Sequence, residues 1–409
     1  MTSRERILAA IDHREPDRVP IDCGAMRSTG IQAIAYNRLK AHLDMQGGHT
    51  RVYDVVQQLA EPEDFCLERF GIDAINAGRQ FPDTGWRDWT LPDGSACQVP
   101  AYLDLRRQNG EWLAHNTEGA VVGKMVQGTT YFSQTCWPFA DDDWFGRLAQ
   151  LPAVMSSIIW AGLPEPMYAE GHSPDNLQRI VAHIRHLRAT QDRAIMLAVG
   201  ANLFEWGTFL RRMDNFLLDL AGDRPKAEAL LDRLVESHLA GFDRILPLVG
   251  DDVDIIQLGD DLGMENGPFM SPRMYREIFK PRHKILVDHI RKTHPGLKVF
   301  LHSCGSIAAL LPDIIEAGFD IINPVQISAR DMEPSRLKKD FGKDITFWGG
   351  GCDTQKILPR GTPRQVRDHV RRNIDVLGPG GGFVFCSVHN ILAEVPPENV
   401  LAMYEAALG

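Results

Sequence analysis

The sequence predicts a (β/α)8 TIM barrel with a small β-rich insertion over the barrel mouth. Short apolar runs ending in Gly, Asp or Asn recur along the chain, each is followed by a long amphipathic stretch, and no GxGxxG follows the first run. Alternating strands and helices form parallel sheets, and seven or eight such units favour a closed barrel over a doubly wound sheet. The 409 residues, 44% of them hydrophobic, can bury one large core, so we expect a single domain over residues 1–409.

The expected barrel strands are the apolar runs in chain order. They are RVPIDCG (18–24) as the candidate for the eighth strand, and GIDAINAG (71–78), IMLAVG (195–200), VDIIQLGDD (253–261), KVFLHSCG (298–305), FDIINPVQ (319–326), DITFWGGG (344–351) and GFVFCSVHN (382–390). Between residues 83 and 143 the pattern changes to short alternating stretches separated by PDG, QNGE and TEG, which are turn sequences. We therefore expect a β-meander inserted over residues 83–143.

Composition narrows the classes of partner. A formal charge of -10 argues against a nucleic-acid or anionic-membrane surface, because either partner requires a basic patch. Seven dispersed cysteines are typical of reduced thiols rather than a disulfide framework. The charged N-terminus lacks a signal-peptide core, and no later run has the length of a membrane helix. We expect a cytoplasmic protein with a small-molecule partner, and a homo-oligomer is compatible with the sequence.

The pair His302 and Cys304 is the strongest functional signal. Both residues end an apolar run, and their i, i+2 spacing directs both side chains to the same face, toward the barrel axis. Active sites of such barrels lie at the carboxyl ends of the strands. Imidazole and thiolate together are a donor set for Zn²⁺. The alternative is a buried thiol beside a hydrogen-bonded histidine, and the strand-end position favours the metal.

A third metal ligand is expected from another strand end. The candidates are Cys352 in WGGGCDTQ, and Cys386 and His389 in FVFCSVHN. Under strict strand alternation Cys386 and His389 cannot both face the barrel interior. If His389 faces inward, Cys386 faces the helical layer. A lone buried cysteine is more often a small apolar residue than a ligand.

Three acids are candidate catalytic residues. Asp260 and Asp261 end the run IIQL, where paired carboxylates can bind a substrate, share a proton or join a metal. Glu205, in ANLFEWGTFLRR, has the same potential if it points inward. The structural alternative is a helix cap and solvated charges.

Three further residues are candidates for substrate binding. Arg27 in GAMRSTG would hold a substrate carboxylate, although a surface arginine is the simpler interpretation. Gln326 ends an apolar run and would donate or accept a hydrogen bond, and Trp206 follows Glu205.

Several motifs together resemble the uroporphyrinogen decarboxylase superfamily. They are PDRVPID, GDDLGMENGPFMSPRMYREIFKPRHKILV, FLHSCGSI, DIINPVQ, WGGGCDTQ and VPPENVLAMYEA, and they span nearly the whole chain. The resemblance implies a (β/α)8 barrel. It also implies one of two activities: cofactor-free decarboxylation of uroporphyrinogen, or zinc-dependent methyl transfer between corrinoids and thiols.

The zinc-dependent branch is the nearer resemblance. Its H-x-C motif, which binds zinc, is matched by His302 and Cys304, and its later Cys ligand corresponds to His389, seven residues before Pro396. A histidine at this position is typical of the decarboxylases, but a neutral histidine also binds zinc. The decarboxylase branch has an essential Asp where this chain has NAGRQ (76–80) and a second arginine where this chain has MRSTG (26–30).

The resemblance therefore implies a zinc-dependent methyltransferase or demethylase of a small methylated substrate. The methyl group would pass to or from a thiol, or a corrinoid supplied by a partner protein. The alternative is a lyase or decarboxylase of a small carboxylic acid at the same site, and a third hypothesis is a metabolite-binding protein without turnover. The substrate, the direction of transfer and the fourth metal ligand stay open.

Overall fold

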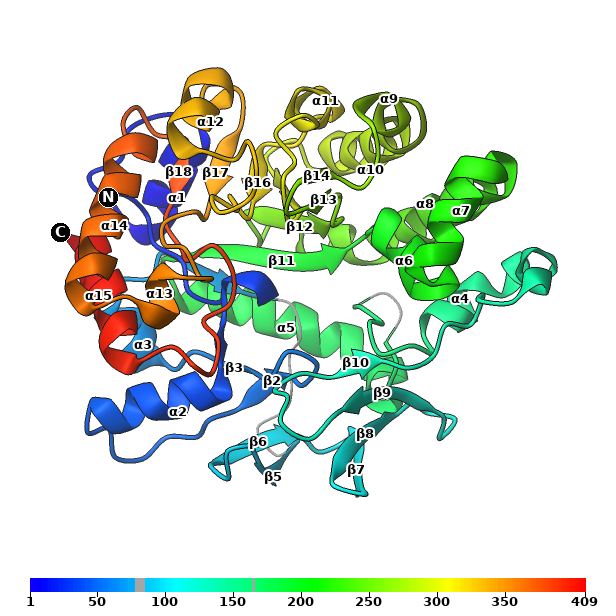
Figure 1. The fold of residues 1–409 in the computed structure, drawn as a ribbon, viewed down its shortest axis with the longest axis horizontal. Coiled ribbons are helices and arrows are strands. Elements are labelled where there is room, and N and C mark those ends of the chain that lie inside the picture. The colour runs from blue at the N-terminus through cyan, green and yellow to red at the C-terminus, as the bar shows by residue number, and fades with distance from the viewer. Residues whose placement is uncertain (78–84, 164–165) are drawn as a thin grey trace.

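A curled parallel sheet lies at the centre of the computed structural model, which describes residues 1–77, 85–163 and 166–409 (Figure 1). Its order is β18-β17-β16-β15-β12-β11-β4. The strands are β4 (Ala74–Asn76), β11 (Ala194–Gly200), β12 (Ile255–Gly259), β15 (Lys298–His302), β16 (Ile321–Asn323), β17 (Thr346–Trp348) and β18 (Phe383–Val384). Their mostly buried residues are typical of parallel strands covered on both faces. The predicted barrel-like fold is confirmed.

The first expected strand closes the gap between β18 and β4. Asp22 N donates to Phe385 O at 2.8 Å, and Phe385 N donates to Pro20 O at 2.8 Å. On the other side, Asp73 N donates to Ile21 O at 2.7 Å. The segment therefore runs parallel to the last strand and completes the ring, as the run RVPIDCG predicts.

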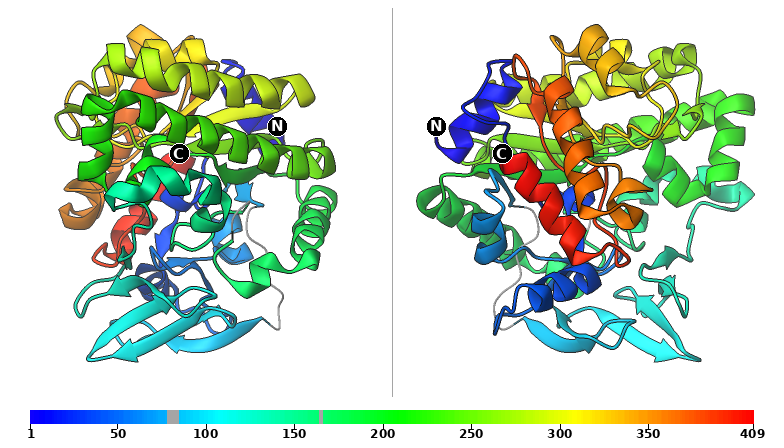
Figure 2. Two further views of the ribbon diagram at one scale, coloured as in Figure 1. Left: turned by 90° about the vertical axis from the view of Figure 1, so that its right-hand side faces the viewer. Right: turned by 60° about the vertical axis from the view of Figure 1, so that its left-hand side comes forward.

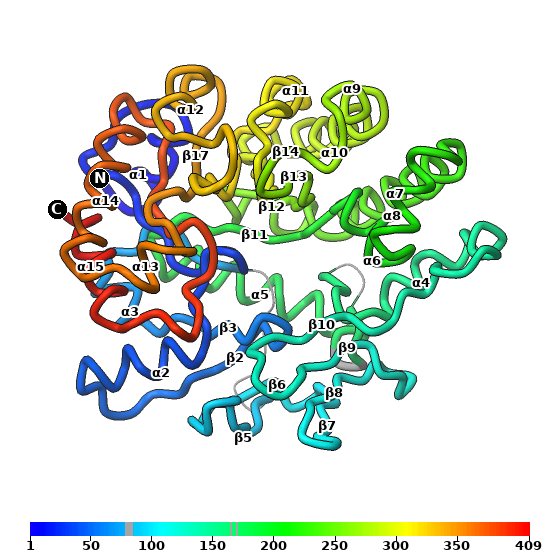
Figure 3. Tube along the Cα trace, in the orientation of Figure 1, coloured from blue at the N-terminus to red at the C-terminus, as the bar shows by residue number. Residues whose placement is uncertain are grey.

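Helices cover the outside of the sheet. They are α2 (Ala33–His42), α3 (Asp64–Arg69), α5 (Pro174–Thr190), α6 (Phe204–Arg211), α7 (Met213–Gly222), α8 (Arg224–Val249), α9 (Pro272–Met274), η4 (Tyr275–Phe279), α10 (Lys280–Thr293), α11 (Leu311–Ala317), α12 (Pro334–Phe341), α13 (Ile357–Arg360), α14 (Pro363–Leu377) and α15 (Pro397–Leu408). The long helix α8 packs beside α10 (Figure 2), and α15 contacts both α14 and α2 (Figure 3). None of the helices in the described ranges is long and apolar enough to cross a bilayer.

Helix α1 (Ser3–Ile11) blocks the amino-terminal end of the barrel. Gly382 N, just before β18, donates to Ala10 O at 2.7 Å, and Arg4 N donates to Asp192 O, just before β11, at 2.8 Å. Apolar residues of α1 join a buried cluster to which every strand of the sheet contributes: Ile7, Ala10, Ile11, Ala25, Met26, Ala74, Ala194, Met196, Ile255, Phe300, Ile321, Trp348, Val384 and Cys386. A cavity in this barrel therefore opens at the carboxyl ends of the strands.

The region between β4 and β11 folds into two small antiparallel sheets on one side of the barrel (Figure 1). One contains β5 (Trp86–Thr90) and β6 (Ala96–Pro100), and the other contains β7 (Asp104–Gln108), β8 (Glu111–His115), β9 (Val121–Met125) and β10 (Ser133–Gln134). Asn109 and Gly110 connect β7 to β8 with φ of 51° and 85°, as in the two-residue turn that Asn-Gly favours. That residues 83–143 form an insertion over the mouth of a single domain stays a prediction, and residues 83 and 84 lie outside the described part.

Short elements complete the chain. They are η1 (Arg27–Thr29), β1 (Ile31–Gln32), β2 (Val52–Asp54), β3 (Leu59–Ala60), η2 (Asp142–Gln150), α4 (Leu151–Met155), η3 (Ala169–His172), β13 (Gly263–Met264) and β14 (Gly267–Pro268). Of these, η1 follows the first barrel strand, and β13 and β14 follow β12, so they lie at the carboxyl ends of barrel strands.

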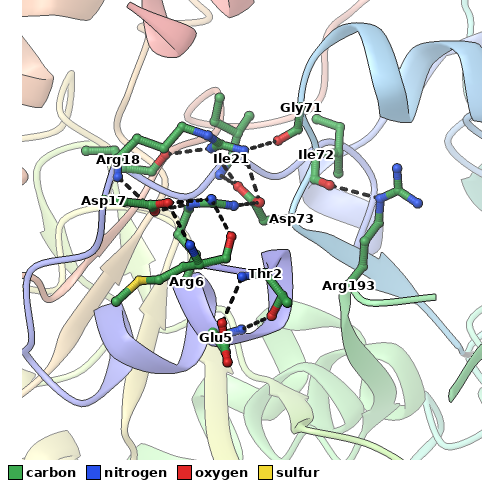
Figure 4. Close-up of polar contacts among 12 residues, drawn as sticks. Thr2, Glu5, Arg6, Asp17, Arg18, Ile21, Gly71, Ile72, Asp73 and Arg193 are labelled. Carbon is green, nitrogen blue, oxygen red and sulfur yellow. Dashed lines mark hydrogen bonds and ion pairs between the residues drawn. The ribbon is translucent and has the colours of Figure 1, made fainter.

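An ion cluster around Asp73 holds the closing strand in place (Figure 4). The Asp73 carboxylate is fully buried and accepts hydrogen bonds from Ile21 N at 2.9 Å, Arg6 Nη1 at 2.6 Å and Arg18 Nη1 at 2.7 Å. The cluster holds two arginines, and Asp17 supplies the second carboxylate: its Oδ1 accepts from Arg6 Nε at 2.7 Å. One buried carboxylate thus ties α1, the closing strand and β4 together.

We predict that Asp73→Asn destabilises the fold by about 3 kcal/mol, because the change leaves two partly buried guanidinium groups without their shared carboxylate. Urea unfolding measures the loss. The control is Asp12→Asn, which removes an exposed partner of Lys298 and should cost less than about 1 kcal/mol. Equal costs for the two variants would contradict the role of Asp73 in closure.

Candidate functional site

A cavity of about 380 Å³ opens at the carboxyl ends of the barrel strands. The predicted site residues that line it lie at or after the carboxyl ends of five different strands: Arg27, Glu205, Trp206, Asp261, His302 and His389. Residues far apart in the sequence therefore meet because parallel strands end at one face. Asp260, Cys304 and Gln326 are not among the lining residues.

Three predicted ligands form one cluster beside this cavity. One donor atom each from His302, Cys304 and His389 lies within 4.8 Å of the others. Cys304 Sγ is 3.4 Å from His302 Nε2, because the two side chains leave the end of β15 on the same side. In tetrahedral zinc sites with ligand bonds of about 2.0–2.3 Å, neighbouring donors are about 3.3–3.8 Å apart. The distance of 3.4 Å between Cys304 Sγ and His302 Nε2 lies within this range.

Asn323, at the end of β16, orients the His302 ring. Asn323 Nδ2 donates to Trp348 O at 2.8 Å, so its Oδ1 faces His302 Nδ1, at 2.6 Å. His302 Nδ1 therefore carries the proton, and Nε2 keeps a lone pair, with Ser28 Oγ at 3.3 Å and Cys304 Sγ at 3.4 Å. Metal-binding histidines are held by such a second hydrogen bond.

His389 enters the cluster through a bend, which corrects one expectation. Alternation holds along β18 as far as Cys386, and Val384 and Cys386 both pack in the barrel interior. The expectation that Cys386 faces the helical layer when His389 faces inward is wrong, because the chain bends at 388–389 and the alternation ends there. Cys386 and Cys352 are fully buried and are not members of the cluster. In the described part of the chain, no hydrogen bond reaches the ring nitrogens of His389.

The protonation states of the cluster follow from burial and neighbouring charges. Burial, with His302 nearby, lowers the pKa of His389 to about 4, so its ring is neutral at pH 7. Burial and the carboxylates of Asp261 and Glu205 raise the pKa of the Cys304 thiol. A divalent cation at the cluster would reverse the effect on the thiol, since it stabilises thiolate.

Glu205 and Asp261 link α6 to the cluster. Glu205 Oε2 accepts from Asp261 N at 3.1 Å and from Asn202 Nδ2. Asp261 Oδ1 accepts from Cys304 N at 2.8 Å and is 3.5 Å from His302 Nε2. Burial and the charges of Asp261 and Asp260 raise the pKa of Glu205.

Asp260 lies behind the cavity rather than in it. Its two oxygens accept from Phe204 N at 3.0 Å and Glu205 N at 2.9 Å, so it caps the start of α6. His283 Nε2 lies 3.1 Å from Asp260 Oδ2, and Tyr275 Oη is 3.1 Å from His283 Nδ1. Within the described residues Asp260 is fully buried, which indicates a positioning role.

The predicted substrate-binding residues differ in their placement. Arg27 and Trp206 line the cavity, with Arg27 Nε 2.8 Å from Asp54 Oδ2. Gln326 instead accepts from Gly305 N at 2.8 Å and donates to Glu265, so it supports the loop that follows Cys304.

Sequence reasoning missed several residues of the site. Asn323 is the last residue of β16, within the run FDIINPVQ, so the rule that polar residues at strand ends are functional could have found it. His238 lies on α8 and Trp160 follows α4, and both line the cavity without a local sequence signal. Residues 78–80 of the NAGRQ segment lie outside the described residues.

Comparisons with known proteins agree with this architecture. Residues 152–408 match the family model described as uroporphyrinogen decarboxylase (URO-D). A uroporphyrinogen decarboxylase from Trichodesmium erythraeum (strain IMS101) is 27% identical over 138 residues, which are 34% of this chain and 36% of that protein. The match thus spans about a third of the curated relative. A solved methyltransferase from Methanosarcina mazei covers 100% of this chain and 98% of its own, with a TM-score of 0.60 and 17% identity, and this likeness shows the fold.

We predict that His238 makes stability depend on pH below neutrality. Its Nε2 is 2.9 Å from Asn202 O, and burial lowers its pKa to about 4. The unfolded chain, with a histidine pKa of about 6.5, then binds more protons between pH 4 and 6.5, so the free energy of unfolding falls as the pH falls through this window. Urea unfolding at pH 7 and pH 5 should show that His238→Gln removes about 2 kcal/mol of this loss. An unchanged pH dependence would contradict it.

Proposed function

The chain belongs to the uroporphyrinogen decarboxylase (URO-D) family, and on that premise we propose that it is a zinc-dependent methyltransferase or demethylase of a small methylated molecule. The observation that carries the proposal is the cluster of His302, Cys304 and His389 beside the cavity. Two nitrogens and one sulfur are a common donor set of catalytic zinc, which keeps a fourth position open for water or substrate. A position facing the cavity is available to a substrate atom.

Zinc held by these residues would supply Lewis acidity, which stabilises a thiolate at neutral pH. Neighbouring groups of the protein set the orientation and the protonation state of these ligands. Asn323 fixes the His302 ring, and the low pKa of His389 keeps that ring neutral. Asp261 holds the backbone N–H of Cys304 and so fixes the turn that carries the thiol.

The methyl group would pass between a small substrate in the cavity and a thiol, or a corrinoid presented by a partner protein. The overlap with the Methanosarcina mazei methyltransferase over the whole chain supports this assignment. Asp261 and Glu205 would position substrate or accept a proton, and Arg27 and Trp206 would contact it. Asp260 acts through α6 as a positioning residue.

A decarboxylase or lyase of a small carboxylic acid is the second candidate. The name of the Trichodesmium relative favours it, as does the histidine at position 389. One assay separates the two candidates. Methyl exchange between methylcobalamin and a small thiol supports the first, whereas release of carbon dioxide from an acid with neither compound present supports the second.

We predict that the purified protein, supplied with zinc, binds about one equivalent. His302→Ala, Cys304→Ser and His389→Ala should each lower the zinc content severalfold, because two ligands hold zinc weakly. Elemental analysis after gel filtration measures it. Cys136→Ser is the matched control, since this half-buried thiol lies outside the cluster. Wild-type protein with less than about a tenth of an equivalent would contradict the proposal.

We predict that Asn323→Leu weakens zinc affinity by about 10–100-fold, because the His302 ring loses the acceptor that fixes its orientation. Competition with a chromogenic chelator measures the affinity. The control is Asn373→Leu, which removes another buried amide, one that donates to Gly350 O and Gly351 O. If both variants lose zinc affinity equally, the effect comes from general destabilisation, and the prediction that Asn323 orients His302 for zinc is wrong.

A further inference from the structure

The Glu205 side chain presents one open carboxyl oxygen inside the cavity. Its Oε2 is held by Asp261 N and Asn202 Nδ2, whereas its Oε1 has no hydrogen-bond partner among the described residues and is not sealed from solvent. Asp261 adds a second carboxylate to the same wall. The open oxygen is therefore available to a ligand.

The cavity has a deficit of positive charge around these acids. Arg27 is the one Lys or Arg among its described lining residues, and its Nε lies 2.8 Å from Asp54 Oδ2. Of the three lining histidines, His238 has a pKa that burial lowers to about 4. Zinc with the Cys304 thiolate would add one net positive charge, which a bound thiolate cancels. Burial and the neighbouring acids raise the pKa of Glu205, and a cation beside its open oxygen would lower that pKa again and stabilise the carboxylate. The paired acids thus favour a cationic ligand.

Three aromatic rings stand next to the acids. Trp206 and Phe209 lie on α6, and Phe209 follows Glu205 by one turn on the same helix face. Trp160 stacks on Phe209 with a centroid distance of 5.3 Å and an interplanar angle of 16°, and Trp206 meets Phe209 at 6.0 Å and 77°. All three rings line the cavity, so they form an aromatic corner in the same cavity as Glu205 and Asp261.

We infer that the cavity binds a small methylated onium cation, such as a trimethylammonium or dimethylsulfonium group, between Glu205 and the aromatic corner of Trp160, Trp206 and Phe209. Aromatic faces attract such cations, whose charge is spread over methyl groups. Methyl groups need no hydrogen-bond acceptors, whereas a primary ammonium must satisfy three donors. The cavity of about 380 Å³ has the size of a small-molecule site.

This inference rests on the proposed function, because it names the methyl donor. The bond between the methyl carbon and the onium nitrogen or sulfur breaks, and its electron pair stays on that atom. A new bond forms from an electron pair of the acceptor thiolate to the methyl carbon. The positive charge of the donor and the negative charge of the thiolate are both lost, so no further reactant is needed.

Isothermal titration calorimetry with the full chain tests the cation site. The probes are choline, its uncharged carbon analogue 3,3-dimethylbutan-1-ol, and ethanolamine, which has the charge without the methyl groups. We expect choline to bind at least about tenfold more tightly than either of the others. Equal affinity for the neutral alcohol or for ethanolamine, or no binding of choline, would overturn the inference.

Amino-acid substitutions test where in the cavity choline binds. Glu205→Gln should weaken choline at least about fivefold and leave the neutral alcohol unchanged, and Trp206→Leu should also weaken choline. Glu265→Gln and Tyr131→Leu are the matched controls, since neither residue lines the cavity and Tyr131 is exposed. Unchanged choline binding in Glu205→Gln with a native melting temperature would overturn the site.

The same measurements separate this inference from the proposed function. Choline binding with this pattern, in a protein that neither holds zinc nor transfers methyl groups, would leave the cation site standing and refute the methyltransferase. Zinc-dependent methyl transfer from neutral donors, without choline binding, would refute the cation site alone.

Discussion

The arrangement of the site depends on the buried carboxylate of Asp260. It receives the first N–H groups of α6, and a carboxylate at a helix N-terminus is favoured by the orphan donors and by the helix dipole. The same carboxylate faces His283, which faces Tyr275. Because α6 is fixed at its first turn, Glu205, Trp206 and Phe209 keep their positions relative to the end of β12. A change at Asp260 would therefore move the whole acidic and aromatic wall at once.

The cluster of His302, Cys304 and His389 has a different origin, since it depends on strand ends. His302 and Cys304 reach it through regular alternation at the end of β15, whereas His389 reaches it because the chain after β18 bends. Asn323 belongs to the next strand and sets the His302 ring. Neighbouring parallel strands thus supply a ligand and the group that orients it.

The sequence was sufficient for the barrel, for its eighth strand and for the clustering of His302, Cys304 and His389, because period-2 and helical patterns and strand-end polarity are local signals. That these three residues bind a metal stays a prediction. It was insufficient for Asp260 and Gln326, whose hydrogen bonds to α6 and to Gly305 depend on packing between segments distant in sequence. Strict alternation misplaced Cys386 because the chain bends at 388–389, and a bend is invisible to a periodic pattern. Trp160 joins the cavity from a segment with no periodic signal at all.

The closing strand has a consequence for synthesis on the ribosome. Ile21 emerges long before Phe385, one of its two neighbours, because most of the barrel lies between them in the sequence. The other edge can pair early, because Asp73 follows Ile21 by only 52 residues. A partly made chain therefore carries an open strand edge on the growing sheet, and open edges invite pairing with other chains. The buried ion cluster at Asp73 holds that first strand in place until the segment of Phe385 pairs with it and closes the barrel.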